Sequence, residues 1–106
     1  MTFDFDSTLN QMLGAAERSF GKDWPKAQSL MKRALQDRKL ALKRLANARL
    51  RKAIDDAGVQ RRLHRSELVM EAAFRATSAI SKAAAQKAVN AALKVLENAL
   101  KQALPG

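Results

Sequence analysis

Apolar residues recur along most of the chain at the three- and four-residue spacing of α-helices. Ser7 is a suitable N-cap for the first run of apolar positions, and Gly21 is a suitable stop. The pattern therefore predicts a short helix over residues 8–20, preceded by an N-terminal tail over residues 1–6.

A second, much longer helix is predicted over residues 24–54. Asp23 is a suitable N-cap for it, and Pro25 falls in its first turn, where proline is tolerated. When its residues are placed at about 100° intervals around the helix axis, the apolar side chains occupy one arc and the basic side chains the opposite arc. The segment is therefore predicted to be an amphipathic helix with an apolar face and a basic back.

The remaining apolar pattern predicts a long alanine-rich helix over residues 59–104. Its two halves present different faces. Val69 and Ile80 share one face, whereas the later leucines follow a face that is rotated by more than roughly 100°. The helix is therefore expected to break or bend, near residues 64–66 or near residues 82–86.

Helices of this length, at about 1.5 Å rise per residue, are too long for a compact ball of this many residues. The sequence therefore predicts an all-α fold, an elongated antiparallel helical hairpin with the short N-terminal helix packed on it. Alanine is the most frequent apolar residue and buries little surface, which favours a dimeric bundle with coiled-coil packing. The apolar seam expected to hold hairpin and dimer together consists of Leu35, Leu42, Leu45, Val89, Leu93, Leu96 and Leu100.

The region between the two long helices, residues 53–66, admits three interpretations: a hairpin turn, a kink or a degenerate helix-turn-helix. The segment Ala57–Arg62 resembles the turn of helix-turn-helix repressors, in which a small residue, glycine and a β-branched residue precede a recognition helix. His64, however, stands where that motif buries an apolar residue. A turn followed by an N-cap at Asp55 or Asp56 is the favoured interpretation.

The chain has a formal net charge of +10, and the whole excess lies between Lys22 and Arg65. Such a patch favours an anionic partner. No aromatic residue lies between Lys26 and Arg65, so base stacking is not expected there. We expect an acidic protein surface, with the phosphates of a nucleic acid as the alternative. A membrane surface is disfavoured, because the cationic C-terminal segment lacks aromatic anchors.

Side chains that could carry catalysis are few. The chain has no cysteine and no tyrosine, its glycines are scattered, and its only histidine, His64, stands among arginines. Glu67 and Glu71 are four residues apart, but Arg75 continues the same helical row and favours an ion pair over a metal site. No catalytic residue, metal or cofactor is predicted. The acidic N-terminus and the lack of a long apolar run favour a cytoplasmic protein, of bacterial or phage origin.

These features predict a non-enzymatic helical interaction protein, an adaptor, scaffold or regulator, that binds an anionic protein partner through a basic helix face. The alternative is a sequence-tolerant nucleic-acid-binding protein that uses the same face. The eight predicted contact residues are Lys32, Arg33, Lys39, Lys43, Arg44, Arg51, Arg61 and Arg62.

Overall fold

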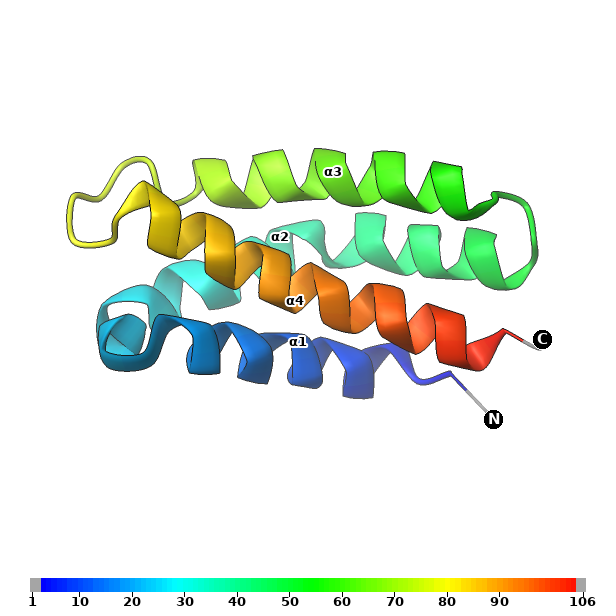
Figure 1. Cartoon of the computed structure of the whole chain (residues 1–106), viewed down its shortest axis with the longest axis horizontal. Helices are drawn as coiled ribbons and strands as arrows, with labels where there is room; N and C mark the ends of the chain where they lie inside the picture. Colours follow the sequence, from blue (N-terminus) through cyan, green and yellow to red (C-terminus); the bar gives the residue numbers. More distant parts are fainter. Residues whose placement is uncertain (1–2, 105–106) are drawn as a thin grey trace.

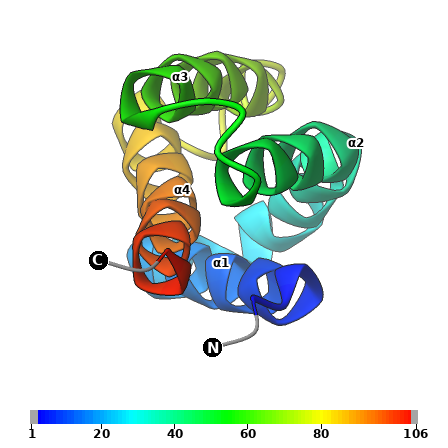
Figure 2. The ribbon, with the colours of Figure 1, turned by 90° about the vertical axis from the view of Figure 1, so that its right-hand side faces the viewer.

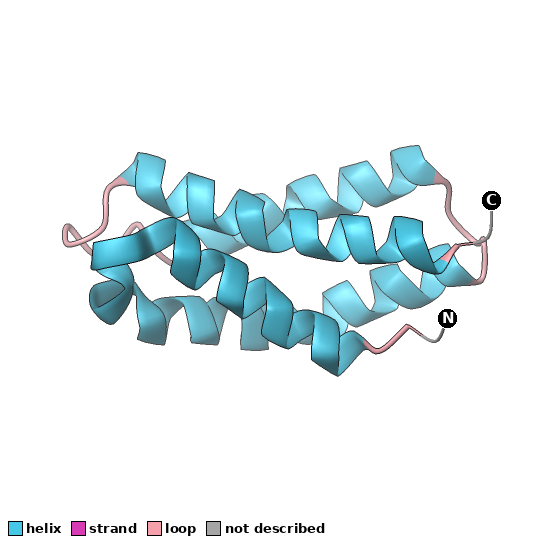
Figure 3. Ribbon diagram, turned by 60° about the horizontal axis from the view of Figure 1, so that its bottom comes forward, coloured by secondary structure: helices cyan, strands magenta, loops and turns pink. Residues whose placement is uncertain are grey.

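A computed structural model describes residues 3–104 and shows four α-helices with loops at the ends of a bundle (Figures 1 and 3). The elements are α1 (Phe5–Phe20), the 3₁₀ turn η1 (Gly21–Asp23), α2 (Trp24–Leu50), α3 (Asp56–Ala72) and α4 (Lys82–Ala103). The described residues contain no strand, which confirms the all-α prediction.

Successive helices run in opposite directions and form an up-down-up-down bundle, seen end-on in Figure 2. Helix α1 packs most extensively on α4, and α2 lies between α1 and α3. The bundle measures 42 × 22 × 19 Å, with a radius of gyration of 13.6 Å. That radius is close to the value of about 13 Å for a compact domain of this size. The predicted elongated hairpin is therefore replaced by a compact bundle.

The reason for this correction is that the long helix predicted over residues 59–104 is two helices, α3 and α4, joined by residues 73–81. The connection lies between the two places where a break was expected, 64–66 and 82–86. The connection reverses the chain direction, so α4 runs antiparallel to α3. The apolar sides of all four helices then face one shared core. The change of apolar face in the sequence has its origin in this connection.

Two buried aliphatic and aromatic side chains hold the connection between α3 and α4 in place. Phe74 is 4% exposed and packs against Phe20, with ring centroids 5.6 Å apart, and Ile80 is 5% exposed. Ser81 then caps α4, because its Oγ accepts a hydrogen bond from the backbone N–H of Ala84 at 3.1 Å. Burial and capping together outweigh the helix propensity of the alanines around them.

Helix α2 ends at Leu50, before the predicted end at residue 54. Lys52 has a left-handed φ of 63°, and its backbone N–H donates to the carbonyl of Arg49. The next N–H, of Ala53, donates to the carbonyl of Ala48 at 2.8 Å. This pair of bonds is a Schellman motif, in which the left-handed position is usually glycine.

Asp55 caps α3, because its Oδ1 accepts a hydrogen bond from the N–H of Gly58 at 2.8 Å. Gly58 therefore lies in the first turn of a helix and has no positive φ. The turn precedes the segment Ala57–Arg62, so the helix-turn-helix interpretation is wrong and region 53–66 begins as a hairpin turn. Arg49 Nη2 donates to Asp56 Oδ1 at 3.1 Å and joins the two sides of that turn.

The core receives side chains from all four helices, and alanine is the most frequent residue type among its buried hydrophobic residues. All seven residues of the predicted apolar seam lie in it, each no more than 4% exposed. Side chains that are already buried inside one chain cannot also form the contact between two chains. The seven seam residues therefore cannot form the contact of the predicted dimer. The dimer itself stays a prediction.

A polar cluster around Glu97 joins α3 to α4. Its carboxylate accepts hydrogen bonds from Gln60 Nε2 at 2.9 Å and from Lys101 Nζ at 3.1 Å, and the Glu97 side chain is only 12% exposed. The bond from Gln60, followed by the charges of Lys101 and Lys94, lowers the pKa of Glu97 below its ordinary value of 4.5, against the opposing effect of burial.

Replacing Lys52 by glycine is expected to stabilise the bundle by about 0.5–1 kcal/mol, because glycine adopts the left-handed conformation without the Cβ clash that lysine suffers. Urea unfolding followed by circular dichroism measures this change. Lys52→Ala is the matched control, since it removes the same charge and keeps the Cβ. Equal stabilisation by both variants would show that charge and not backbone conformation is responsible.

Glu97→Gln is expected to lower the free energy of unfolding by about 1 kcal/mol at neutral pH, because it removes a charge-assisted bond. A carboxyl whose pKa is lowered by folding contributes stability above its unfolded pKa and loses it as the pH falls through the lower folded value. The difference between wild type and variant should therefore be constant above about pH 5 and shrink below pH 4.5. A difference that does not change with pH would contradict this assignment.

Candidate anionic-partner interface

The outer surface of α2 carries most of the excess positive charge. Its core side is formed by buried residues such as Leu35 and Leu42. On the opposite side lie exposed basic residues at helical spacing. These are Lys26, Lys32, Arg33, Lys43 and Arg44, followed by Arg51 at the helix end. The structure thus places the predicted basic back of this helix toward solvent.

One of the eight predicted contact residues has a partner within the bundle. Lys39 Nζ lies 3.7 Å from Asp6 Oδ1 of α1, and its side chain is 39% exposed. The other seven are exposed, and no carboxylate oxygen of residues 3–104 lies within 4.0 Å of their cationic groups. Lys39 therefore fastens α2 to α1, and the remaining seven are available to an external anion.

Two side-chain contacts set the register between α2 and α3. Arg38 Nη2 donates to the buried Ser66 Oγ at 3.0 Å, and Arg49 meets Asp56 at the turn. The two helices are antiparallel, so residue numbers rise along α2 in the direction in which they fall along α3. Counting from the two pairs therefore shows which residue of α3 lies at the same height along the bundle axis as a given residue of α2. Arg44 is about level with residue 60, and Arg62 and Arg65 of α3 lie level with the stretch of α2 between Arg33 and Arg44.

The side of each helix that faces the other can be read from the same contacts. On α3, Arg62 and Val69 lie in one helical row with Ser66, which contacts α2, whereas Gln60 lies on the side that contacts α4. On α2, Arg44 lies between the outer surface and the side that contacts α3. The α2–α3 basic face is therefore formed by Arg33, Arg44, Arg51, Arg62 and Arg65.

Lys32 and Lys43 lie on the other flank of α2, toward α1, together with Lys39. Arg61 lies near the α2–α3 turn, where it lines an open hollow of about 500 Å³ with Ile54 and Lys52. The eight predicted residues are thus divided among two flanks and the turn rather than gathered in one stripe. Arg65 joins the face although it was not among them.

Three large aliphatic side chains are exposed among these cations: Leu40 is 58% exposed, Leu68 48% and Val69 46%. Within residues 3–104 they are the exposed large hydrophobic residues. Leu40 has Lys43 and Arg44 one helical turn away. By the register set above, Leu40 is about level with residue 64, and Val69 lies about one helical turn further along.

One of these exposed aliphatic residues has a signal in the sequence. Leu40 lies in the middle of the basic arc of α2, seven residues after Arg33 and four before Arg44. The helical spacing of the sequence predicts that Val69 shares an apolar packing face with Ile80, but the connection between α3 and α4 separates those two residues. An apolar residue inside a basic arc is the pattern that would have found Leu40.

Apolar surface also lies beside cations closer to the turn. An open hollow of about 290 Å³ on the outer side of α2 is lined by Leu50, Arg44, Asn47 and Arg51. Leu50 is partly buried and packs against the core, as Ile54 does in the hollow beside Arg61. The combination of aliphatic and cationic side chains therefore extends from Leu40 to the turn.

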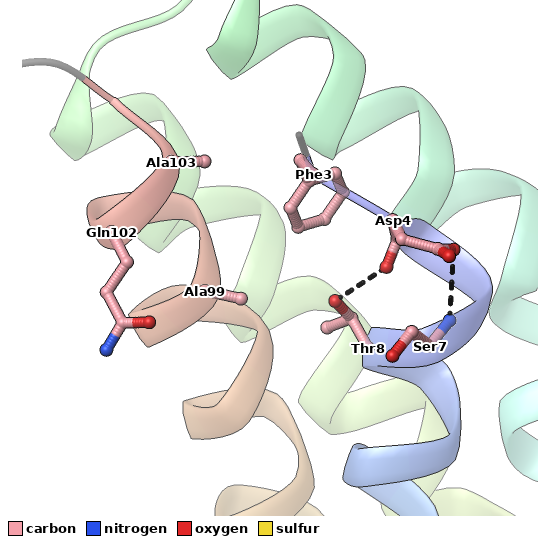
Figure 4. Close-up of a pocket in the computed structure, with 7 residues that line it drawn as sticks. All are labelled: Phe3, Asp4, Ser7, Thr8, Ala99, Gln102 and Ala103. Atoms are coloured by element: carbon pink, nitrogen blue, oxygen red, sulfur yellow. Dashed lines mark hydrogen bonds between the residues drawn. The ribbon is translucent and has the colours of Figure 1, made fainter. Parts of the chain in front are cut away.

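A further hollow, of about 180 Å³, lies on the opposite side of the molecule between the start of α1 and the end of α4 (Figure 4). Its polar groups on α1 are engaged at the start of that helix. The Asp4 carboxylate accepts from the N–H of Ser7 at 3.1 Å, and the Asp4 carbonyl accepts from Thr8 Oγ1 at 2.9 Å. These groups are engaged with their own helix and do not converge on a shared point.

No group of three or more His, Asp or Glu side chains in residues 3–104 is arranged to hold a metal ion. His64 is exposed and its Nδ1 lies 3.9 Å from Glu67 Oε2. None of the helices in this part of the chain is both long and apolar enough to cross a membrane. Comparison with models of protein families, with curated proteins and with solved structures finds no match to this chain.

The unpaired cations of α2 and α3 repel one another, and this repulsion opposes folding. Arg61 and Arg65 are one example, four residues apart on the same helix. Raising the salt concentration from roughly 0.02 to 0.2 M is expected to increase the free energy of unfolding in urea by a few tenths of a kcal/mol. The double variant Arg61→Gln, Arg65→Gln should reduce this increase, whereas Lys87→Gln on α4 should leave it unchanged. A decrease with salt would contradict the proposed repulsion.

Proposed function

We propose that this protein is a non-enzymatic interaction protein, an adaptor, scaffold or regulator, that binds an acidic protein surface through the outer surface of α2 and α3. The observation that supports this most directly is the meeting of unpaired arginines from two adjacent helices around exposed aliphatic side chains. Arginine is enriched in protein interfaces, where its planar guanidinium pairs with carboxylates through two parallel hydrogen bonds.

The exposed aliphatic residues favour a protein partner over a nucleic acid. Phosphate contacts require only cations and hydrogen-bond donors. Leu40 and Val69 add nothing to such contacts, but an apolar side chain of a protein partner would remove their surface from water, at a gain of about 25 cal/mol per Å² buried. A surface that combines arginines with exposed aliphatic side chains is complementary to a partner that combines carboxylates with apolar side chains.

A nucleic acid remains the second candidate because of the length of the basic row on α2. Arg33 and Arg51 are 18 residues apart, which is roughly 27 Å along the helix axis. This distance is most of the length of one turn of duplex DNA. Binding of this kind would depend steeply on salt, since each neutralised phosphate releases counterions.

The homodimer expected from the sequence and the cytoplasmic location are part of the same proposal. With the seam residues buried, a symmetric dimer has only exposed surface for its contact, and a dimer through the α2–α3 basic face would bring that face against its own copy. A dimer through this face would be weakened at low salt by like-charge repulsion, so sedimentation equilibrium at two salt concentrations tests it.

Reversing three charges of the α2–α3 basic face, in the variant Arg33→Glu, Arg44→Glu, Arg62→Glu, is expected to abolish binding of labelled poly-L-glutamate at roughly 150 mM salt. The matched control carries the same change of net charge elsewhere, at Arg75, Lys82 and Lys87, which are exposed and have no ion-pair partner in residues 3–104. Fluorescence anisotropy measures binding, and circular dichroism checks that helix content is unchanged. Lys39 is left intact because it is paired with Asp6.

The same titration with labelled duplex DNA separates the two candidates. Binding of poly-L-glutamate that survives in the control but not in the face variant supports the proposed function. Tight binding of DNA alone, with a steep salt dependence, would replace it by the nucleic-acid function. Equal loss in both variants would show that net charge and not this face governs binding.

A further inference from the structure

The aliphatic side chains of the α2–α3 basic face have a definite arrangement. Leu40 of α2 and Val69 of α3 lie within about one helical turn of each other along the bundle, on two adjacent helices. Leu50 lies ten residues after Leu40, roughly 15 Å further along α2 toward the turn, but in the helical row of Lys39 and Lys43 on the flank toward α1. Apolar contact points are therefore distributed along the bundle axis, with arginines beside each of them.

This arrangement fits a helix better than an extended chain. An extended peptide gains its affinity mainly by adding a strand to a sheet edge, and residues 3–104 contain no sheet. A helix satisfies its own backbone hydrogen bonds and presents apolar side chains in one row. Residues at i, i+7 and i+11 of such a helix are about 10 and 16 Å apart, which suits the spacing from Leu40 to Leu50.

The charges favour an acidic partner over a second copy of this chain as the occupant of this surface. A two-fold dimer through this surface would bring the patch that holds Arg33, Arg44 and Arg62 against the same patch of the other copy, and Asp37 is the one acidic residue on the outer surface of α2. An acidic partner instead pairs its carboxylates with arginines that have no partner within residues 3–104.

We propose that the partner docks as an acidic amphipathic helix, which lies along α2 and α3 with its apolar row over Leu40 and Val69 and its carboxylates toward Arg44 and Arg62. This proposal rests on the proposed function and adds the chemistry of the partner. Charge supplies attraction and orientation, and the apolar row supplies discrimination against other polyanions.

The test uses two labelled peptides of about 18 residues, five helical turns, with identical glutamate and leucine content. In one, leucines fall at i, i+4, i+7 and i+11, and in the other the same residues are shuffled so that no apolar row exists. The protein variant is Leu40→Gln, Val69→Gln, which changes two exposed side chains and no charge. Ala83→Gln, at an exposed position on α4, is the matched control.

Wild type and the Ala83→Gln control are expected to bind the ordered peptide about tenfold more tightly than the shuffled one in fluorescence anisotropy. Leu40→Gln, Val69→Gln should reduce this ratio to near one while leaving the affinity for poly-L-glutamate unchanged. A peptide that becomes helical on binding should also increase the signal at 222 nm in circular dichroism.

The outcomes distinguish this proposal from the proposed function. Equal binding of both peptides, lost together in the charge-reversed variant, would overturn the amphipathic helix and leave an acidic protein surface as the partner. Failure of both peptides and of poly-L-glutamate would overturn the proposed function itself. Tight binding of duplex DNA with no peptide binding would overturn both proposals and identify nucleic acid as the ligand of this face.

Discussion

The large share of alanine in the core is the constraint on which the rest of this structure depends. Alanine is the most frequent buried hydrophobic residue, and each buried alanine contributes little apolar surface. Two helices facing each other across alanines would bury too little to offset the entropy of ordering them. Four helices closed around one axis cover the larger core residues, such as Leu42 and Leu96, from several sides, and both are fully buried.

The distribution of charge follows from the same arrangement. Where ion pairs cross between elements, they belong to the bundle itself: Lys39 with Asp6 joins α2 to α1, and Arg49 with Asp56 joins the sides of the turn. The acids of α1, α3 and α4 are engaged in caps and in these contacts, or lie away from the outer surface of α2. The repulsion among the arginines left over is a cost to folding that an anionic partner would remove.

The sequence predicts those features that depend on local patterns, such as the periodicity of a helix. It does not predict features that depend on contacts between residues far apart in the chain. The amphipathic pattern of α2 and the apolar seam are strong periodic signals, and burial follows them. The turn after Leu50 was harder to place because Lys52, not glycine, holds the left-handed position. The connection between α3 and α4 depends on Phe74 packing against Phe20, a contact between residues far apart in sequence that no local pattern contains.

The misplacement of Val69 shows why a functional surface of this kind is hard to read from sequence. A helical row that looks continuous through residues 73–81 makes Val69 a core residue, and only the break between α3 and α4 turns it outward beside Arg62 and Arg65. A surface of arginines alone attracts any polyanion, because long-range charge carries little shape information. In the proposed interface, exposed aliphatic side chains at fixed positions between those arginines select a partner with matching apolar residues, so Leu40 and Val69 would supply the specificity and the arginines the attraction.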